Sequence, residues 1–382
     1  MLTQRFELFR LLGFAVRTDW SWLLLAATVA LSFAAWVFPS RYPEILPALS
    51  WAMGAATALG LAASVLLHKL AHAVTARYYG REIDAIGLFL VGDAFETDAQ
   101  LPSPQGELAV ALAGPAASVF AGGSLLLAWI WGSTSGGSLG ANAVLGYLAA
   151  ANLTLGLLNL LPAYPLDGGR ALSATLWLLR GEPEWAARIT AALGSAFGVA
   201  LLVLGIVLLI NGALPLGLTF LLGGMMLRAG SQVTLRQFAM RRTLAGEAVS
   251  RFMKTEPVVV ERASSVERLV EDFIYRHQHP LFPVVDGERL FGCVSAYHVQ
   301  QLPREEWDRQ TVGSIAERAS EANTVAPTTD ALAALSLMNR SRTGWLMVAE
   351  AGRLLGILRS EELLRFVALK NQLEGPARVS AA

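Results

Sequence analysis

Two histidines inside a long apolar stretch are the residues best suited to chemistry in this sequence. His68 and His72 lie four residues apart, so on a helix both imidazoles project from one face and can bind the same ion. On a solvated helix such a pair is usually structural. Ionisable side chains within a membrane span, by contrast, are costly and mostly face a functional interior. The pair therefore predicts a metal site at membrane depth.

A possible third ligand follows later, where residues 159–170 read NLLPAYPLDGGR. Pro162 and Pro165 interrupt the helix, and irregular backbone at membrane depth is tolerated only where it is buried in protein or lines a cavity. Asp167 comes directly after this break. It is either the N-cap of a helix that starts near Arg170 or the partner of the two histidines. Two histidines and one carboxylate leave one position for water on tetrahedral zinc, as in hydrolytic sites.

The elements that must position these residues are membrane helices. The chain has 382 residues, of which 54% are hydrophobic and 16% are charged, whereas a soluble domain has roughly 25% charged residues. The deficit lies in residues 1–230, where uncharged stretches approach the roughly 20 residues that cross a bilayer. Six transmembrane helices are predicted, the sixth being the shortest. They are Trp20 to Pro39, Ile45 to Leu67, Leu108 to Trp131, Ala143 to Pro162, Ile189 to Ile210 and Ala213 to Leu227.

The basic residues that flank these spans predict their orientation, because Lys and Arg collect on the cytoplasmic side. With the N-terminus inside, the outer side carries Arg41 alone. The inner side carries Arg5, Arg10, Arg17, Arg77, Arg81, Arg170, Arg180, Arg188, Arg228, Arg236, Arg241 and Arg242. We therefore expect a multi-pass protein of the cytoplasmic membrane, with its N-terminus and its C-terminal part in the cytoplasm. The first span is too long for a cleaved signal peptide and is expected to be retained.

From about Val249 onward, short Val-rich strands alternate with polar helices, and this pattern occurs twice. Gly292 in the first copy corresponds to Gly356 in the second, and an internal duplication indicates a repeated structural unit. Residues 246–370 resemble a tandem pair of CBS domains. In that family each repeat is a small sheet with two helices, and the clefts of the pair often bind adenine nucleotides.

The order and spacing of all these motifs resemble the site-2 protease family of intramembrane zinc metalloproteases (peptidase M50-like), in the subgroup that carries a C-terminal CBS pair. The resemblance covers nearly the whole chain. It rests on residues 10–13 and 20–22, HxxxH at 68–72, Ala113-Gly114-Pro115, NxxPxxPLDG at 159–168, and the CBS repeats. The fold expected is an α-helical membrane protein of about six transmembrane helices with a C-terminal α/β CBS-pair domain. Residues 1–230 are then the transmembrane metalloprotease-like domain, 231–245 a linker, 246–370 the CBS pair and 371–382 a tail.

The resemblance implies a role for the polar residues of these motifs. It implies a Zn²⁺ ion held by His68, His72 and Asp167. Asn159 matches the family residue thought to hold the unwound substrate or its developing oxyanion. The activity implied is cleavage of the transmembrane segments of other membrane proteins, that is, regulated intramembrane proteolysis, with the lipid bilayer and membrane-spanning protein substrates as partners.

The resemblance also implies a strand that pairs with an extended substrate. Residues 86–96 take the place of the membrane-associated strands of the family. A Gly-Gly pair common at this position appears here as Gly92-Asp93, followed by Ala94. The predicted substrate-binding residues are therefore Gly92, Asp93 and Ala94.

Lys69 departs from the family pattern, which has a glutamate in the second position of HExxH. That glutamate takes a proton from zinc-bound water and passes it to the leaving amine. A protonated lysine has no lone pair, and its charge disfavours both zinc and the transition state. General acid–base catalysis is worth about two to four orders of magnitude, so hydrolysis is expected to be impaired. Three explanations remain: a substituted form of an active protease, a natural pseudoprotease or membrane adaptor, and another group acting as the base.

Other classes of protein and partner fit the sequence less well. The 30 basic and 30 acidic residues balance, which does not favour nucleic acid, and the single Cys293 excludes a disulfide framework. A CBS-regulated transporter is the alternative class, but no internal repeat is found in the membrane half. Where nucleotide-binding CBS domains have Asp, this chain has His298 and Glu362. Adenine nucleotide is therefore a disfavoured partner, and protein contact or homodimerisation through the CBS pair is the alternative.

Overall fold

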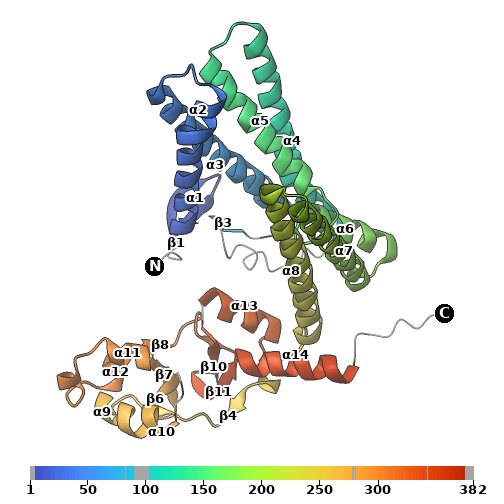
Figure 1. The fold of residues 1–382 in the computed structure, drawn as a ribbon. Coiled ribbons are helices and arrows are strands. Elements are labelled where there is room, and N and C mark those ends of the chain that lie inside the picture. The colour runs from blue at the N-terminus through green and yellow to red at the C-terminus, as the bar shows by residue number, and fades with distance from the viewer. Residues whose placement is uncertain are drawn as a thin grey trace. The chain divides into compact units, whose positions relative to one another are not determined.

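The computed structural model describes residues 5–81, 83–89, 103–277, 279, 281–341 and 343–374. It divides into two units, Met1–Arg236 and Gln237–Ala382, and each unit is described here by itself (Figure 1).

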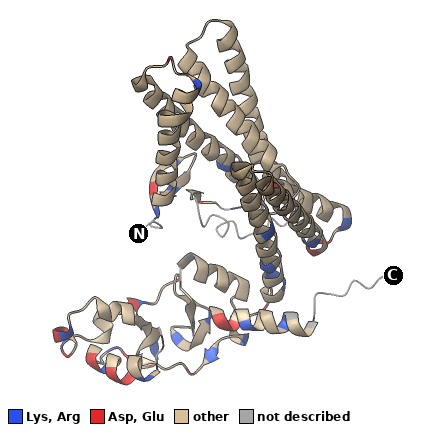
Figure 2. Ribbon diagram, viewed as in Figure 1, with Lys and Arg blue, Asp and Glu red and all other residues tan. Residues whose placement is uncertain are grey.

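Helices make up most of the N-terminal unit (Figure 1). They are α1 (Trp20–Ser32), the π-helix η1 (Phe33–Val37), α2 (Phe38–Arg41), α3 (Pro47–Tyr78), α4 (Pro104–Thr134), α5 (Leu139–Asn159), α6 (Asp167–Arg180), α7 (Pro183–Ile210) and α8 (Leu214–Leu244). Within the described residues, six helical stretches are long and apolar enough to cross a membrane, namely Trp20–Arg41, α3, α4, α5, α7 and α8. Charged residues are sparse along them, apart from the basic residues in the C-terminal half of α8 (Figure 2). The predicted helical membrane fold with six spans is confirmed.

Most of these helices extend beyond the apolar stretches from which they were predicted, whereas α5 ends at Asn159, before the predicted end at Pro162. α3 continues to Tyr78, and α8 is 31 residues long rather than a short partial span. Hydropathy marks only the part of a helix that suits the hydrocarbon core, whereas good helix formers continue the same hydrogen bonding into water. Residues 231–244, most of the segment taken as a linker, accordingly belong to α8.

A three-stranded sheet in the same unit was not predicted as a sheet. β1 (Arg5–Leu11) and β2 (Phe14–Asp19) form an antiparallel hairpin. Leu12 and Gly13 at its turn have φ values of 50° and 80°, which suits the type I′ turns of two-residue hairpins. β2 also pairs in parallel with β3 (Ala85–Leu88). Within the described residues the strand order is β1-β2-β3, so β3 is an edge strand.

Close packing of the helices is made possible by glycines. A Cβ atom at Gly122 of α4 would lie 2.8 Å from Leu153 on α5, and one at Gly156 of α5 would lie 3.0 Å from the Pro115 carbonyl oxygen of α4. Small residues let helix backbones approach closely in membranes. α4 and α5 therefore pack together along this glycine-lined contact.

The C-terminal unit is an α/β structure. Its strands are β4 (Lys254–Thr255), β5 (Val260–Glu261), β6 (Leu281–Asp286), β7 (Arg289–Ser295), β8 (Glu317–Arg318), β9 (Thr324–Val325), β10 (Trp345–Glu350) and β11 (Arg353–Arg359). Its helical segments are η3 (Val249–Arg251), α9 (Val266–Arg268), η4 (Leu269–Ile274), α10 (Tyr275–His277), α11 (Ala296–Gln300), η5 (Arg304–Glu306), α12 (Val312–Ile315), α13 (Ala331–Ser341) and α14 (Ser360–Glu374). The main strand order is β5-β6-β7-β11-β10-β9.

The duplication predicted from the sequence is visible in the strand register. The β6–β7 hairpin has an irregularity between Val284 and Val285, and the β10–β11 hairpin has one between Val348 and Ala349. These are corresponding positions of the two repeats. Each repeat also has its own apolar core, one around Val284 and the other around Val348.

Candidate metal centre

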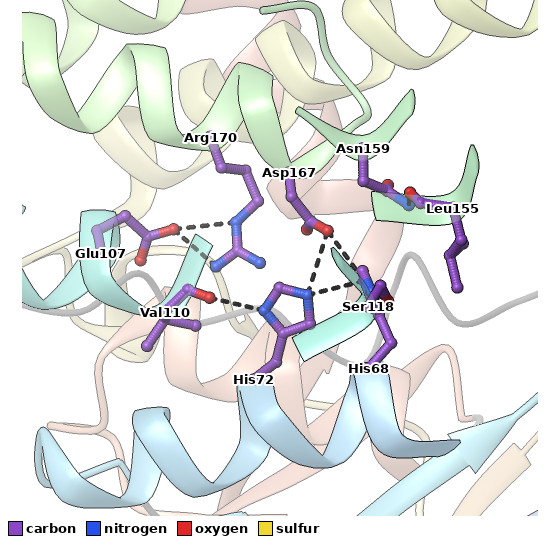
Figure 3. A network of polar contacts seen from close by, with 9 residues as sticks. All are labelled: His68, His72, Glu107, Val110, Ser118, Leu155, Asn159, Asp167 and Arg170. Carbon is purple, nitrogen blue, oxygen red and sulfur yellow. Dashed lines mark hydrogen bonds and ion pairs between the residues drawn. The ribbon is translucent and has the colours of Figure 1, made fainter. Parts of the chain in front are cut away.

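His68, His72 and Asp167 come together at one point between three helices (Figure 3). Asp167 Oδ2 lies 3.1 Å from His68 Nε2 and 3.2 Å from His72 Nε2, and the two Nε2 atoms are 3.1 Å apart. Among the described residues, these three side chains form a group whose ligand atoms all lie within 4.8 Å of one another, close enough to hold one metal ion. Two imidazole nitrogens and one carboxylate oxygen are ligands that zinc accepts.

The second nitrogen of each imidazole is bound to α4. His72 Nδ1 donates to the Val110 carbonyl oxygen at 2.7 Å, and His68 Nδ1 lies 2.9 Å from Ser118 Oγ. A carbonyl oxygen can only accept, so the proton of a neutral His72 is on Nδ1 and its Nε2 keeps a lone pair. Hydrogen bonds of this kind orient metal-ligating histidines. The arrangement therefore suits metal binding at both Nε2 atoms.

Gly114 of α4 provides the space in which the three ligand atoms meet. A Cβ atom at this position would collide with His72 Nε2 and would lie 2.7 Å from His68 Nε2. Glycine is thus required by the close approach of the α4 backbone to the site. This gives the Ala113-Gly114-Pro115 motif a physical role.

Asp167 owes its position to the break after α5. α5 ends at Asn159, and α6 begins at Asp167 itself with Leu166 as its N-cap and no side-chain capping bond. The interpretation of Asp167 as the N-cap of a later helix is therefore wrong. The loop is held by α8, because Ser231 Oγ donates to the Tyr164 carbonyl oxygen at 3.0 Å.

A buried ion pair next to the site was missed in the sequence. Arg170 donates to Glu107 Oε1 through Nη2 at 2.7 Å and through Nε at 3.1 Å (Figure 3). The Glu107 side chain is only 8% exposed. Glu107 precedes Val110 by one helical turn and Arg170 follows Asp167 by one turn, so the pair connects the parts of α4 and α6 that form the site. The sequence feature that could have indicated this pair is Glu107 itself, an acidic residue directly before the third apolar span.

Lys69 points to the small sheet. Its Nζ donates to the Gly87 carbonyl oxygen of β3 at 2.6 Å. On the same side of α3, Leu66, Leu70 and Ala73 pack in an apolar cluster that includes residues of β2 and β3. The contacts given for the two histidines, by contrast, are with α4 and α6. Two adjacent residues of α3 thus contact different elements: His68 contacts α4 and α6, and Lys69 contacts β3.

The remaining predicted site residues are Asn159 and the three proposed substrate-binding residues. The Asn159 side chain donates to the Leu155 carbonyl oxygen at 2.9 Å within α5, and it lines an open, mostly apolar groove together with Phe33, Tyr147 and Leu166. Gly92, Asp93 and Ala94 lie outside the described residues.

Histidines of the C-terminal unit have structural contacts. His298 Nδ1 accepts from the Ser295 backbone N–H at 3.2 Å, within the capping box of α11. Glu362 lies in the first turn of α14. The His277 and His279 rings stack with centroids 6.0 Å apart, and burial, with Lys254, His277 and Arg359, lowers the pKa of His279. Among the described residues, none of these histidines belongs to a three-ligand group.

Comparisons with known proteins agree with this architecture. The model of peptidase family M50 matches residues 134–205, and that of the CBS domain matches residues 249–302 and 312–369. Rip3 of Mycobacterium tuberculosis is 28% identical, covering 94% of this chain and 91% of its own. Zinc metalloprotease MJ0392 of Methanocaldococcus jannaschii is also 28% identical, covering 80% and 83%.

A solved structure of the site-2 protease from Methanocaldococcus jannaschii is 26% identical to the chain. It covers 61% of this chain and 96% of its own, with a TM-score of 0.39. The two family models by themselves identify a peptidase family M50 match at residues 134–205 followed by a pair of CBS domains, in agreement with the family resemblance drawn from the sequence.

Proposed function

We propose that this protein holds zinc at His68, His72 and Asp167 and acts on the transmembrane segments of other membrane proteins, with peptide hydrolysis slowed by Lys69. The observation that carries the proposal is the ligand triad, with the Nδ1 atoms of both histidines bound to α4 and the Nε2 atoms facing Asp167. Bound zinc would polarise a peptide carbonyl and lower the pKa of a coordinated water.

Asn159 is proposed to bind the substrate backbone. Its side-chain amide is at the last residue of α5, and the groove that it lines also includes Leu166, the neighbour of Asp167. A preorganised amide donor there would stabilise the charge that develops on the peptide oxygen. The present bond to the Leu155 carbonyl oxygen lies within the same helix, so a substrate carbonyl would have to compete with it for the amide.

The outer edge of β3 is proposed to pair with an extended stretch of substrate. An exposed strand edge presents backbone donors and acceptors to which another strand can add. β3 lies directly over α3 through the cluster of Ile86 with Ala73, so a strand added there would run beside the helix that carries both histidines. Gly92, Asp93 and Ala94 remain predicted contacts.

Lys69 is proposed to reduce hydrolysis because no proton acceptor replaces glutamate at this position. Its nitrogen is held at β3 by the bond to Gly87. Glu107, which precedes Val110 by one helical turn, accepts two hydrogen bonds from Arg170. These bonds direct Oε1 of Glu107 towards Arg170 on α6, which argues against Glu107 as the substitute base.

Lys69→Glu tests the proposed reaction. Purified in detergent with a model transmembrane substrate, this variant is expected to cleave about 100-fold faster than the unmodified chain, because general acid–base catalysis contributes about two to four orders of magnitude. Lys69→Glu combined with His68→Ala is the control and is expected to be inactive. Zinc content by mass spectrometry, compared with His68→Ala alone, checks the metal separately. Equal, substantial cleavage with and without the glutamate would contradict the proposed role of Lys69.

A non-catalytic membrane adaptor is the second candidate, and the lysine itself favours it. An adaptor would capture the same membrane clients with and without Lys69→Glu and would release no fragments. Pull-down of clients followed by mass spectrometry of their fragments separates the two functions. A transporter is disfavoured because its mechanism does not require a histidine pair with Asp167 at this spacing.

A further inference from the structure

The side chain of Lys69 is held at the outer edge of β3, where an added strand would have to bind. Lys69 follows Leu66 by three residues and precedes Ala73 by four, so it lies on the side of α3 that packs against the sheet. From there its Nζ reaches the Gly87 carbonyl oxygen at 2.6 Å.

The direction of the Gly87 carbonyl follows from the hydrogen bonds of its neighbours. The Asp84 carbonyl oxygen accepts from the Ala15 N–H at 2.9 Å, and the Leu88 carbonyl oxygen accepts from Thr18 Oγ1 at 3.1 Å. Both acceptors therefore face β2. Successive residues of a strand direct their backbone groups alternately to opposite sides in the plane of the sheet. The N–H and C=O of Gly87 consequently face away from β2, towards the outer edge.

We propose that Lys69 closes the outer edge of β3 by occupying the Gly87 carbonyl, so that an extended client segment must displace the lysine before it can pair. This inference rests on the proposed function, because it concerns the same substrate-pairing edge. It gives Lys69 a second effect that is independent of catalysis. The nitrogen donates to a carbonyl oxygen whether it is an ammonium or an amine, so the effect does not require a particular protonation state.

The family glutamate could not occupy this carbonyl, because a carboxylate and a carbonyl oxygen are both acceptors. Lys69→Glu would therefore restore a base and open the edge at the same time. Lys69→Met separates the two effects, since methionine keeps an unbranched apolar stem and has neither a donor for Gly87 nor a proton acceptor. Lys69→Arg keeps a donor, and Lys254→Met is the matched control outside the membrane domain.

The experiment measures binding of a fluorescent model transmembrane helix that contains a Gly-Pro break in its cytoplasmic half. The full chain in lipid nanodiscs is titrated and the dissociation constant is measured by energy transfer. Lys69→Met is expected to bind roughly tenfold more tightly or better, the factor that corresponds to losing a competing hydrogen bond to a charged group. Lys69→Arg and Lys254→Met are expected to bind like the unmodified chain. A photo-crosslinker at position 85 is expected to react with the helix more in Lys69→Met than in the unmodified chain.

Equal affinity of Lys69→Met and the unmodified chain would overturn the inference, as would an equal gain for Lys254→Met. If Lys69→Met does not fold, Lys69→Leu replaces it, and folding is checked by thermal unfolding. Measuring the zinc content of the same samples distinguishes a failure of this inference from a failure of the proposed function. Bound zinc with no gain in affinity rejects only the closed edge, whereas a gain without zinc supports the closed edge and rejects the metallopeptidase.

Discussion

At the scale of single residues, the candidate centre depends on which atoms the surrounding helices leave available. His72 uses Nδ1 for the Val110 carbonyl, and His68 uses Nδ1 for Ser118, so both Nε2 atoms face Asp167. Gly114 makes room for them. Together, these contacts orient the three ligand atoms so that they can bind one ion.

Gly114→Ala is expected to weaken zinc binding about tenfold or more. Substitutions of residues that support metal ligands typically lower metal affinity by about this factor. The new methyl group would lie where the two Nε2 atoms now meet. Gly123→Ala is the matched control, because it is in the same helix and a Cβ there meets nothing within 4 Å. Both changes give a similar gain in helix propensity, about 1 kcal/mol. Zinc content by mass spectrometry measures the outcome, and full zinc binding by Gly114→Ala would contradict the proposed site.

At the scale of elements, α4 is the helix that organises the site. It carries Val110, Gly114 and Ser118 at successive turns against α3, and Glu107 against α6. The three positions lie four residues apart, so they share one face of the helix. The break between α5 and α6 then places Asp167 opposite that face.

Glu107→Gln is expected to lower the free energy of unfolding by about 3 kcal/mol, because it leaves the Arg170 guanidinium without its charged partner in a buried position. Zinc binding should weaken too, since the pair connects α4 and α6 beside Asp167. Glu182→Gln is the matched control at the other end of α6. The Arg180–Glu182 pair is exposed and its loss should cost less than about 1 kcal/mol. Unfolding in mixed micelles measures both variants, and equal effects would contradict the structural role of Glu107.

At the scale of the whole molecule, the chain joins a multi-pass membrane domain to a pair of CBS domains. In the CBS pair, His298 lies in the first turn of α11, where its Nδ1 accepts from the Ser295 backbone N–H at 3.2 Å. Protein contact or homodimerisation through the CBS pair stays a prediction, with adenine nucleotide as the disfavoured partner there. The cytoplasmic location of both ends of the chain also stays a prediction.

Labelling of introduced cysteines tests the orientation. Ser135→Cys, in the loop between α4 and α5, is expected to react with a membrane-impermeant maleimide in intact cells, and Glu182→Cys, between α6 and α7, only after permeabilisation. The natural Cys293 should give little background, because burial first and then Glu317 raise the pKa of its thiol to about 12 and the thiolate is the reactive form. The reverse pattern of labelling would show that the predicted orientation is wrong.

The sequence alone determined the membrane spans, the CBS duplication and the identity of the candidate ligands. These follow from local signals: uncharged length, a repeat, and ionisable residues where the bilayer makes them costly. It also identified Lys69 as the departure from the family pattern. The break at Pro162 and Pro165 was predicted for the same reason, because proline cannot continue a helix.

Only the tertiary structure decided what those residues contact. The pairing of β2 with β3, the Glu107–Arg170 pair and the bond from Lys69 to Gly87 join segments that no local pattern relates. Such contacts depend on how helices and strands pack, and a one-residue difference along α3, from His68 to Lys69, decides whether a side chain meets α4 or the sheet. For that reason the sequence could show that Lys69 lacks the chemistry of glutamate, while the structure alone shows where its nitrogen goes.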